Sequence, residues 1–153
     1  MIRIDDAEDV ARAIFSPQMI GPDGELLLSA FALRVFKDGT TEDYVSVSRT
    51  SIESWLKDIR QIPQRRNRQL YGYAEMNVGE IRTIRKDHVK YDVVPCANIT
   101  TPSHAGIFIT VNNEKLVGGR PLLSIQDKNA QDFILLSIRQ ELVKIAQKRL
   151  RVI

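Results

Sequence analysis

The sequence predicts an α+β fold, with a mostly antiparallel sheet and about three helices, two of them amphipathic and packed on one face. Two observations lead to this class. Several short segments alternate apolar with polar residues, as half-buried strands do, whereas two longer segments repeat apolar residues at helical spacing. These strands and helices do not alternate strictly along the chain, which argues against a doubly wound parallel sheet.

Length and composition predict one domain over residues 1–153. Of the 153 residues, 43% are hydrophobic and 27% are charged, as is ordinary for a globular protein with one core. Cys96 is the only cysteine, and an unpaired thiol fits a reducing compartment. The start lacks a signal-peptide pattern, and no apolar run approaches the ~20 residues that span a bilayer. We therefore expect a cytoplasmic protein without a membrane partner.

The first third of the chain predicts a helix, a turn and a β-hairpin. Residues 7–14 repeat apolar side chains at helical spacing after a capping aspartate, which predicts a helix. Residues 21–24 have the composition of a turn. Residues 26–36 are ambiguous between helix and strand, and the alternation in their second half favours a strand. Asp38-Gly39 is a turn signal between that segment and residues 44–48, which predicts the hairpin.

The clearest helix signal comes next. Thr50 and Glu53 have the spacing of a capping box, in which each side chain bonds a backbone N–H at the start of a helix. Apolar residues then recur at helical spacing as far as Ile62, and Pro63 ends the run. The sequence therefore predicts a helix that begins at Thr50.

The middle of the chain predicts short strands. Residues 70–76, 88–94 and 106–111 are apolar or alternating segments, and residues 115–117 form a shorter one. Asn77 and Glu80 can cap a short helical turn between the first two of these segments.

The last third predicts a long amphipathic helix that Asn129 caps. Its apolar stripe faces the core and consists of Leu135, Ile138, Leu142 and Ile145. If this helix also presents an apolar face to the outside, the protein is an interaction subunit that binds a protein partner or forms a homo-oligomer through it. That is one of three functional hypotheses.

Charge is unevenly distributed, although the net charge is only +3. Residues 1–56 carry five basic and ten acidic side chains, a balance of −5, and residues 57–90 carry nine basic and four acidic, a balance of +5. Such a reversal marks either an anion-binding face or two solvated surfaces. If the acidic third pairs with the basic segment in the fold, the charge argument for binding disappears.

Five cations, called the basic cluster below, form the densest positive run: Lys57, Arg60, Arg65, Arg66 and Arg68. Guanidinium groups bind phosphate through paired hydrogen bonds, and the tyrosines that follow, Tyr71 and Tyr73, can stack on bases. The cluster therefore predicts a module that binds nucleic acid or another polyanion. A solvated helix end and loop remains the alternative, since no helix-turn-helix, RNP or zinc-finger pattern accompanies the cluster.

The remaining hypothesis is a small transferase or hydrolase that acts on a nucleotide or phosphorylated substrate. His104 precedes an apolar strand, where a histidine can act as a general base near neutral pH. Arg49 and Ser48 stand just before the predicted helix and would hold the substrate anion. A histidine bonded to a loop carbonyl, and plain helix capping, are the alternatives. Whether the protein is an enzyme stays open.

No metal site or cofactor is predicted. His88, Asp92 and Cys96 step by four, but on a strand this step separates neighbours by about 13 Å, too far for one metal ion. The sequence has no phosphate loop, dinucleotide fingerprint, nucleophile elbow or zinc-protease motif.

Overall fold

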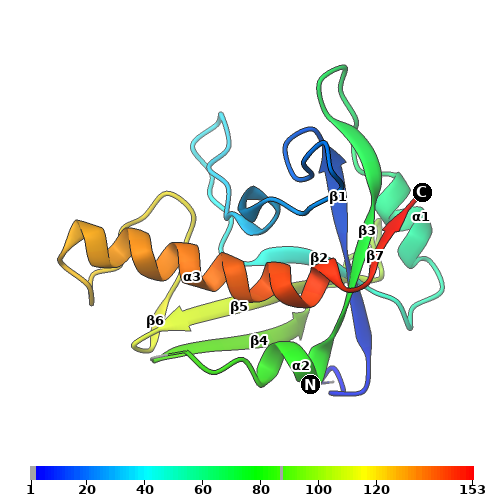
Figure 1. Cartoon of the computed structure of the whole chain (residues 1–153). Coiled ribbons are helices and arrows are strands. Elements are labelled where there is room, and N and C mark those ends of the chain that lie inside the picture. Colours follow the sequence, from blue (N-terminus) through cyan, green and yellow to red (C-terminus); the bar gives the residue numbers. More distant parts are fainter. Residues whose placement is uncertain (1–2, 87) are drawn as a thin grey trace.

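The computed structural model describes residues 3–86 and 88–153. In this part of the chain seven strands form one antiparallel sheet in the order β4-β5-β2-β1-β3-β7, with β6 paired to β5 (Figure 1). The strands are β1 (Asp9–Ser16), β2 (Val45–Arg49), β3 (Gln69–Asn77), β4 (Val89–Pro95), β5 (His104–Val111), β6 (Glu114–Lys115) and β7 (Leu150–Val152). The helices are α1 (Trp55–Arg60), α2 (Val78–Arg82) and α3 (Lys128–Gln147), with the 3-10 turn η1 (Leu28–Phe31). The predicted α+β class is confirmed.

The helix α3 lies across the sheet and closes the core (Figure 1). Three residues of the predicted stripe, Ile138, Leu142 and Ile145, are buried, and Leu135 packs against the core while partly exposed. The hydroxyl of Tyr91 in β4 donates to the carbonyl of Ile138 at 3.3 Å, which joins the helix to the sheet. No helix in the described residues is long and apolar enough to cross a membrane.

The predicted strands of the middle segment are confirmed as β3, β4 and β5. The strand predicted over residues 115–117 is shorter and begins one residue earlier, as the two-residue β6. Asn77 caps α2, because its Oδ1 accepts from the N–H of Glu80 at 2.9 Å. The predicted cap of α3 is wrong by two residues. Asp127, not Asn129, accepts from the N–H of Ala130 at 2.9 Å.

The predicted first helix is wrong, because residues 9–16 form the strand β1. This strand lies between β2 and β3, and every residue from Val10 to Phe15 is buried. A strand covered on both faces has a nearly continuous apolar sequence instead of an alternating one. Its pattern therefore resembles that of a buried helix.

The region predicted as the first hairpin has its turn and its second strand in place, because residues 45–49 form β2, but it lacks the first strand. Gly39 has a φ of 87°, and one bridge between Val35 and Thr41 closes a small loop around it. Residues 28–31 form η1, so the strand predicted over residues 26–36 is wrong. The strand β2 pairs with β1 and β5 instead.

The predicted capping box is also wrong. The hydroxyl of Thr50 donates to the backbone carbonyl of Asp9 at 3.2 Å, so it joins β2 to β1 and does not cap a helix. The helix of this region exists but is shorter, since α1 begins at Trp55 and ends at Arg60.

A candidate anion-binding pocket

A pocket of about 310 Å³ opens where β1 and β2 separate. Their ladder contains only the pairs Val10–Arg49 and Ala11–Ser48. Beyond this point, segments that are far apart in the sequence line the cavity. Its volume is at the lower end of the range for small-molecule sites. One wall is apolar and consists of Phe15, Met19, Ile59 and Ile62.

Arg12 fills the gap between the two strands. It is only 6% exposed, and its Nε donates to the carbonyl of Ala30 at 3.0 Å and its Nη1 to that of Ser46 at 2.8 Å. No carboxylate in residues 3–86 or 88–153 forms an ion pair with it. Burial, with a smaller contribution from the charge of Arg34, lowers the pKa of Arg12 to about 10. The guanidinium is therefore charged at neutral pH, buried, and bonded only to neutral groups.

Two more guanidinium groups line the same pocket, and with Arg12 they are called the pocket arginines below: Arg34 and Arg68. The guanidinium of Arg68 lies 3.9 Å from the ring centre of Phe15, and burial followed by the charge of Arg34 lowers its pKa. Glu42 is the nearby carboxylate. It accepts from the backbone N–H of Arg34 at 2.8 Å, but its oxygen is 4.0 Å from the Nε of Arg34. Asp58 also lines the pocket, so three cations face two carboxylates there, and the mutual repulsion of the cations falls when an anion enters.

His104 stands at the edge of this pocket. It lies directly opposite Ser48 in the β2–β5 ladder, so both side chains project from the same face of the sheet. The imidazole contacts the ring of Tyr44 with centroids 5.7 Å apart. Burial lowers the pKa of His104, while a backbone hydrogen bond at Cys96 and the charge of Asp58 oppose this. His104 is therefore neutral at neutral pH and able to accept a proton.

Asp58 of α1 holds the start of β5 in place. Its Oδ2 accepts from the N–H of Ser103 at 3.1 Å and from the hydroxyl of Ser103 at 2.5 Å. Burial raises the pKa of Asp58, but the hydrogen bonds from Ser103 and Ser54 outweigh it and the net shift is downward. The ionised carboxylate therefore fixes the residue before His104 and, through it, the position of the imidazole.

Arg49 is engaged elsewhere, although Ser48 beside it lines the pocket. Its Nη2 donates to both oxygens of Glu8, at 2.9 and 3.1 Å, and the hydroxyl of Ser51 donates to the same carboxylate at 2.7 Å. Burial raises the pKa of Glu8, but these hydrogen bonds outweigh it, so the net shift is downward. Arg49 forms an ion pair at the β1–β2 end and does not line the pocket.

The basic cluster lies beside the pocket and reaches it through Arg68. Arg65 and Arg68 exchange backbone hydrogen bonds of 2.9 and 3.0 Å, which closes a tight loop between α1 and β3. Lys57, Arg60, Arg65 and Arg66 are exposed. Tyr71 and Tyr73 are half-buried on β3, and the ring of Tyr73 meets that of Trp55 edge-on at 5.0 Å.

The acidic first third pairs with cations other than the basic cluster. Glu8 pairs with Arg49, Asp9 with Arg149, Asp6 with Arg82 and Asp43 with Lys115. In the described part of the chain no member of the basic cluster forms an ion pair. The charge reversal seen in the sequence is therefore not cancelled by ion pairing within these residues.

A second cavity, of about 470 Å³, lies between α3 and the segment 116–121. Its cations are Arg120, Lys128 and Arg139, none of which is buried, and Lys128 pairs with Asp132 at 3.2 Å. This cavity is larger, but among the residues that line it no buried charge points to a ligand. The pocket at β1 and β2 is the stronger candidate.

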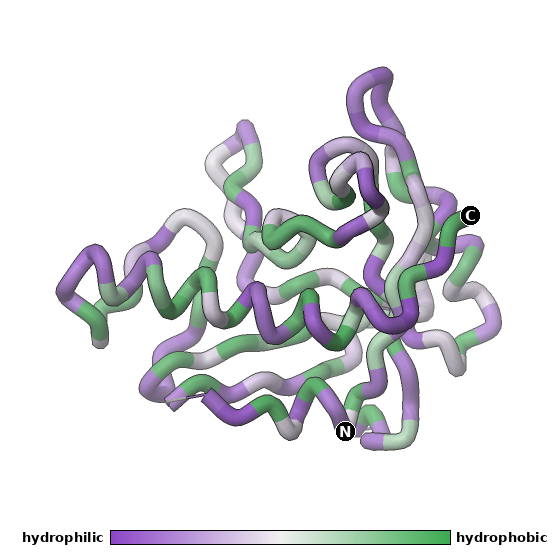
Figure 2. The backbone as a smooth tube through the Cα atoms, in the orientation of Figure 1, coloured by the Kyte–Doolittle hydropathy of each residue, from purple (hydrophilic) through white to green (hydrophobic). Residues whose placement is uncertain are grey.

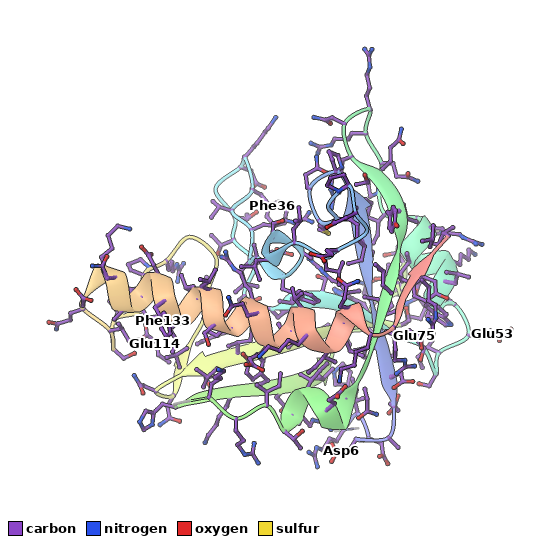
Figure 3. All side chains as sticks on the ribbon, in the orientation of Figure 1. Asp6, Phe36, Glu53, Glu75, Glu114 and Phe133 are labelled. Carbon is purple, nitrogen blue, oxygen red and sulfur yellow. The ribbon has the colours of Figure 1, made fainter. Side chains whose placement is uncertain are left out.

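The exposed apolar residues do not form one continuous face. Phe133, on the N-terminal half of α3, is 72% exposed, and Phe36, in the segment between η1 and β2, is 45% exposed. The two lie on separate parts of the surface (Figure 3). The predicted interaction through the C-terminal helix therefore stays a prediction, with Phe133 and Leu136 as the exposed apolar residues of that helix.

No group of three or more histidine, cysteine or acidic side chains in the described residues is close enough to hold a metal ion. Sequence reasoning missed Arg12, Arg34 and Glu42 as site residues. The signal for Arg12 was present, because an arginine stands in the middle of an otherwise apolar run, and a buried cation needs a specific partner. Arg34 and Glu42 carry no comparable local signal.

No family model, curated protein or solved structure matches this chain. Its function is therefore argued from its own residues.

Proposed function

We propose that this protein binds a phosphorylated small molecule, of the size and shape of a nucleotide, in the pocket between β1 and β2. The observation that carries the proposal is the charged guanidinium of Arg12, 6% exposed and bonded only to two backbone carbonyls. A buried cation without an anion costs free energy, and proteins keep such groups where a ligand supplies the missing charge.

Phosphate fits the pocket better than a carboxylate. A phosphomonoester carries about −1.5 to −2 charges at neutral pH and three acceptor oxygens. Three guanidinium groups line the pocket and can donate to these oxygens, whereas a carboxylate offers only two oxygens. Guanidinium groups bind phosphate through paired hydrogen bonds, and the neighbouring serines Ser46 and Ser48 can donate one bond each. The apolar wall then accommodates a ring attached to the phosphate.

Calorimetric titration with three probes tests this proposal: phenyl phosphate, adenosine monophosphate and uncharged adenosine. The two phosphates should bind and adenosine should not. Arg68→Ala should weaken binding by roughly tenfold, because one charge-assisted hydrogen-bonding group is lost. The matched control Arg66→Ala removes an exposed cation from the same loop and should leave the affinity unchanged. Equal binding of adenosine and its monophosphate, or equal loss in both variants, contradicts the proposal.

A second candidate function is hydrolysis or transfer at the bound phosphate, with His104 as the general base. It is favoured by one observation, the neutral imidazole of His104 at the pocket edge opposite Ser48. In hydrolysis His104 takes a proton from a water whose oxygen bonds to phosphorus, while the P–O bond to the leaving group breaks and that oxygen gains a proton.

Binding and turnover separate these two functions. If His104 is the base, His104→Asn abolishes release of inorganic phosphate from phenyl phosphate but keeps its affinity within about twofold, since the pocket arginines are intact. If the wild-type protein binds phenyl phosphate and releases no phosphate from this or a nucleotide probe, the enzymatic candidate fails and the binding function stands.

A further inference from the structure

We infer that the phosphate which enters the pocket is the terminal phosphate of a single-stranded nucleic acid, and that the basic cluster binds the strand that follows it. This inference rests on the proposed function and adds the class of ligand. The pocket and the cluster share Arg68, whose backbone closes the loop and whose side chain lines the pocket. A ligand anchored by its phosphate at Arg68 therefore leaves the pocket beside Arg65 and Arg66.

The loop that carries these arginines is free to meet a ligand. It projects beyond the sheet between α1 and β3 and is hydrophilic along its tip (Figure 2). The cluster has no ion-pair partner in the described residues, although ten acidic side chains precede it in the sequence. A row of unpaired cations that continues from a phosphate site is the electrostatic pattern of a groove that follows a nucleic-acid backbone.

Two tyrosines stand on β3, the strand that follows this loop. Tyr71 and Tyr73 are two residues apart on β3 and so share one face of the sheet, and both are partly exposed. Arg151 of β7 lies directly opposite Tyr73, which brings a cation from the far end of the chain to the same face. Alternating aromatic rings and guanidinium groups bind unpaired bases and phosphates with little regard to sequence.

The inner end of the pocket explains why a strand end, and not its middle, is bound. The side chain of Arg12 lines the pocket between β1 and β2 and is held there by two backbone carbonyls, so a strand that passes through this gap would have to displace it. A cavity of about 310 Å³ is at the small end of the range for single small ligands, so it accepts one unpaired terminal nucleotide and no base pair.

Fluorescence anisotropy with oligothymidylates of about eight nucleotides tests the inference. One pair carries a 5′-phosphate or a 5′-hydroxyl, with the dye at the 3′ end, and a second pair exchanges the two ends. Thymidine monophosphate and a duplex with the same terminal phosphate are competitors. One of the two phosphorylated strands should bind at least tenfold more tightly than its hydroxyl partner and than thymidine monophosphate, and the duplex should compete poorly.

The double variant Arg65→Ala/Arg66→Ala should weaken binding of the phosphorylated strand by five- to tenfold and leave thymidine monophosphate unaffected. The slope of log K against log salt should fall by about 1.4, which is 0.7 for each of two phosphate contacts. The control Arg85→Ala/Lys90→Ala removes equal charge from exposed positions near β4 and should change neither affinity.

Other outcomes overturn the inference, and they distinguish it from the proposed function. If thymidine monophosphate binds as tightly as the phosphorylated strands, the pocket binds free nucleotides and the basic cluster is not part of the site. If the hydroxyl-ended strands, the duplex or heparin bind equally well, the cluster is a general polyanion surface and the pocket does not recognise a strand end. If no phosphate probe binds at all, the proposed function fails as well.

Discussion

Two groups of arginines in this protein have opposite surroundings. Arg49, Arg82 and Arg149 each donate to carboxylates at 2.6 to 3.2 Å. These ion pairs join the first residues of the chain to β2, α2 and the end of α3. The pocket arginines instead lie near one another, and in the described residues their one ion-pair contact is the 4.0 Å approach of Glu42 to Arg34. Folding alone explains the first group, because each cation meets an anion when the chain folds.

The second group is not explained by folding. Like charges that converge in a partly buried pocket destabilise the native state, and burial followed by the charge of Arg34 lowers the pKa values of Arg12 and Arg68. Natural proteins accept such local costs mainly at functional sites. A structural arginine in this protein is therefore distinguished from a ligand-binding arginine by its hydrogen-bonding partners and not by the number of charges around it.

Replacing Arg12 should have the largest effect. Arg12→Met removes the donors to the buried carbonyl of Ala30 and the partly buried carbonyl of Ser46, so the free energy of unfolding should fall by about 2–4 kcal/mol. Affinity for phenyl phosphate should fall roughly 10- to 100-fold. Urea unfolding and calorimetric titration measure the two effects.

Two further variants keep this prediction testable. Arg12→Lys retains the charge and should keep the fold, but it loses the paired hydrogen bonds of a guanidinium and should still bind weakly. Arg49→Met should lower stability and spare the affinity, because its partner is Glu8 and not a ligand. Equal loss of affinity in the Arg12 and Arg49 variants would erase the distinction between the two groups.

Gly106→Ala should displace side chains at the edge of the pocket without changing a charged residue. A Cβ atom at this position would lie 2.5 Å from Cδ2 of Tyr44, whose ring packs on His104 and Phe108. Such overpacking costs about 1–3 kcal/mol of stability. The displaced ring should also shift the imidazole signals of His104 in an NMR spectrum. A variant as stable as wild type, with unchanged His104 signals, would show that Tyr44 does not position the histidine.

Strands with one solvated face were predictable from the sequence, and the central strand was not. In β4 the buried residues Val89, Tyr91 and Val93 alternate with the exposed Lys90 and Asp92, so the period of two is visible. In β1 both faces are covered, and the period disappears. The role of Arg12 in this strand was not predictable either, because the two carbonyls to which it donates are 18 and 34 residues away in the sequence.

Local hydrogen-bonding signals failed where a distant acceptor competed. Thr50 has the correct spacing to cap a helix, but its hydroxyl bonds the carbonyl of Asp9, 41 residues earlier. Asn77 meets no such competitor at its Oδ1, and its predicted cap forms. The basic cluster was visible because it is a run in the sequence, whereas the pocket depends on β1 and β2 separating, which no local pattern encodes.

The paired arginines should impose an acid limit on stability. Above all, the hydrogen bond from Arg149 lowers the pKa of Asp9 below its ordinary value of 3.8. The folded state therefore holds this proton less tightly than the unfolded state. The resulting stability is fully present above the pKa of the unfolded state and is lost as pH falls through the pKa of the folded state.

Asp9→Asn should lower the free energy of unfolding by about 1 kcal/mol at neutral pH, and this free energy should depend less on pH in the acid range. The affinity for phenyl phosphate should be unchanged. If the variant loses stability at acid pH in the same way as wild type, the ion pair of Asp9 with Arg149 does not contribute to stability.

The smallest effect should come from His104, because the charge of Asp58 and a hydrogen bond at Cys96 oppose the burial that lowers its pKa. The unfolded chain takes up a proton at the ordinary pKa of 6.5, whereas the folded chain takes it up only at a lower pH. Protonation therefore favours unfolding, and stability should fall as pH drops below about 6.5.

His104→Asn should remove this contribution to the slope of the free energy of unfolding against pH. The control His88→Asn, at an exposed position, should keep it. Urea unfolding between about pH 7 and about pH 5.5 measures the slope. If the slope survives in His104→Asn, the imidazole is not the half-buried neutral group that a general base in this pocket has to be.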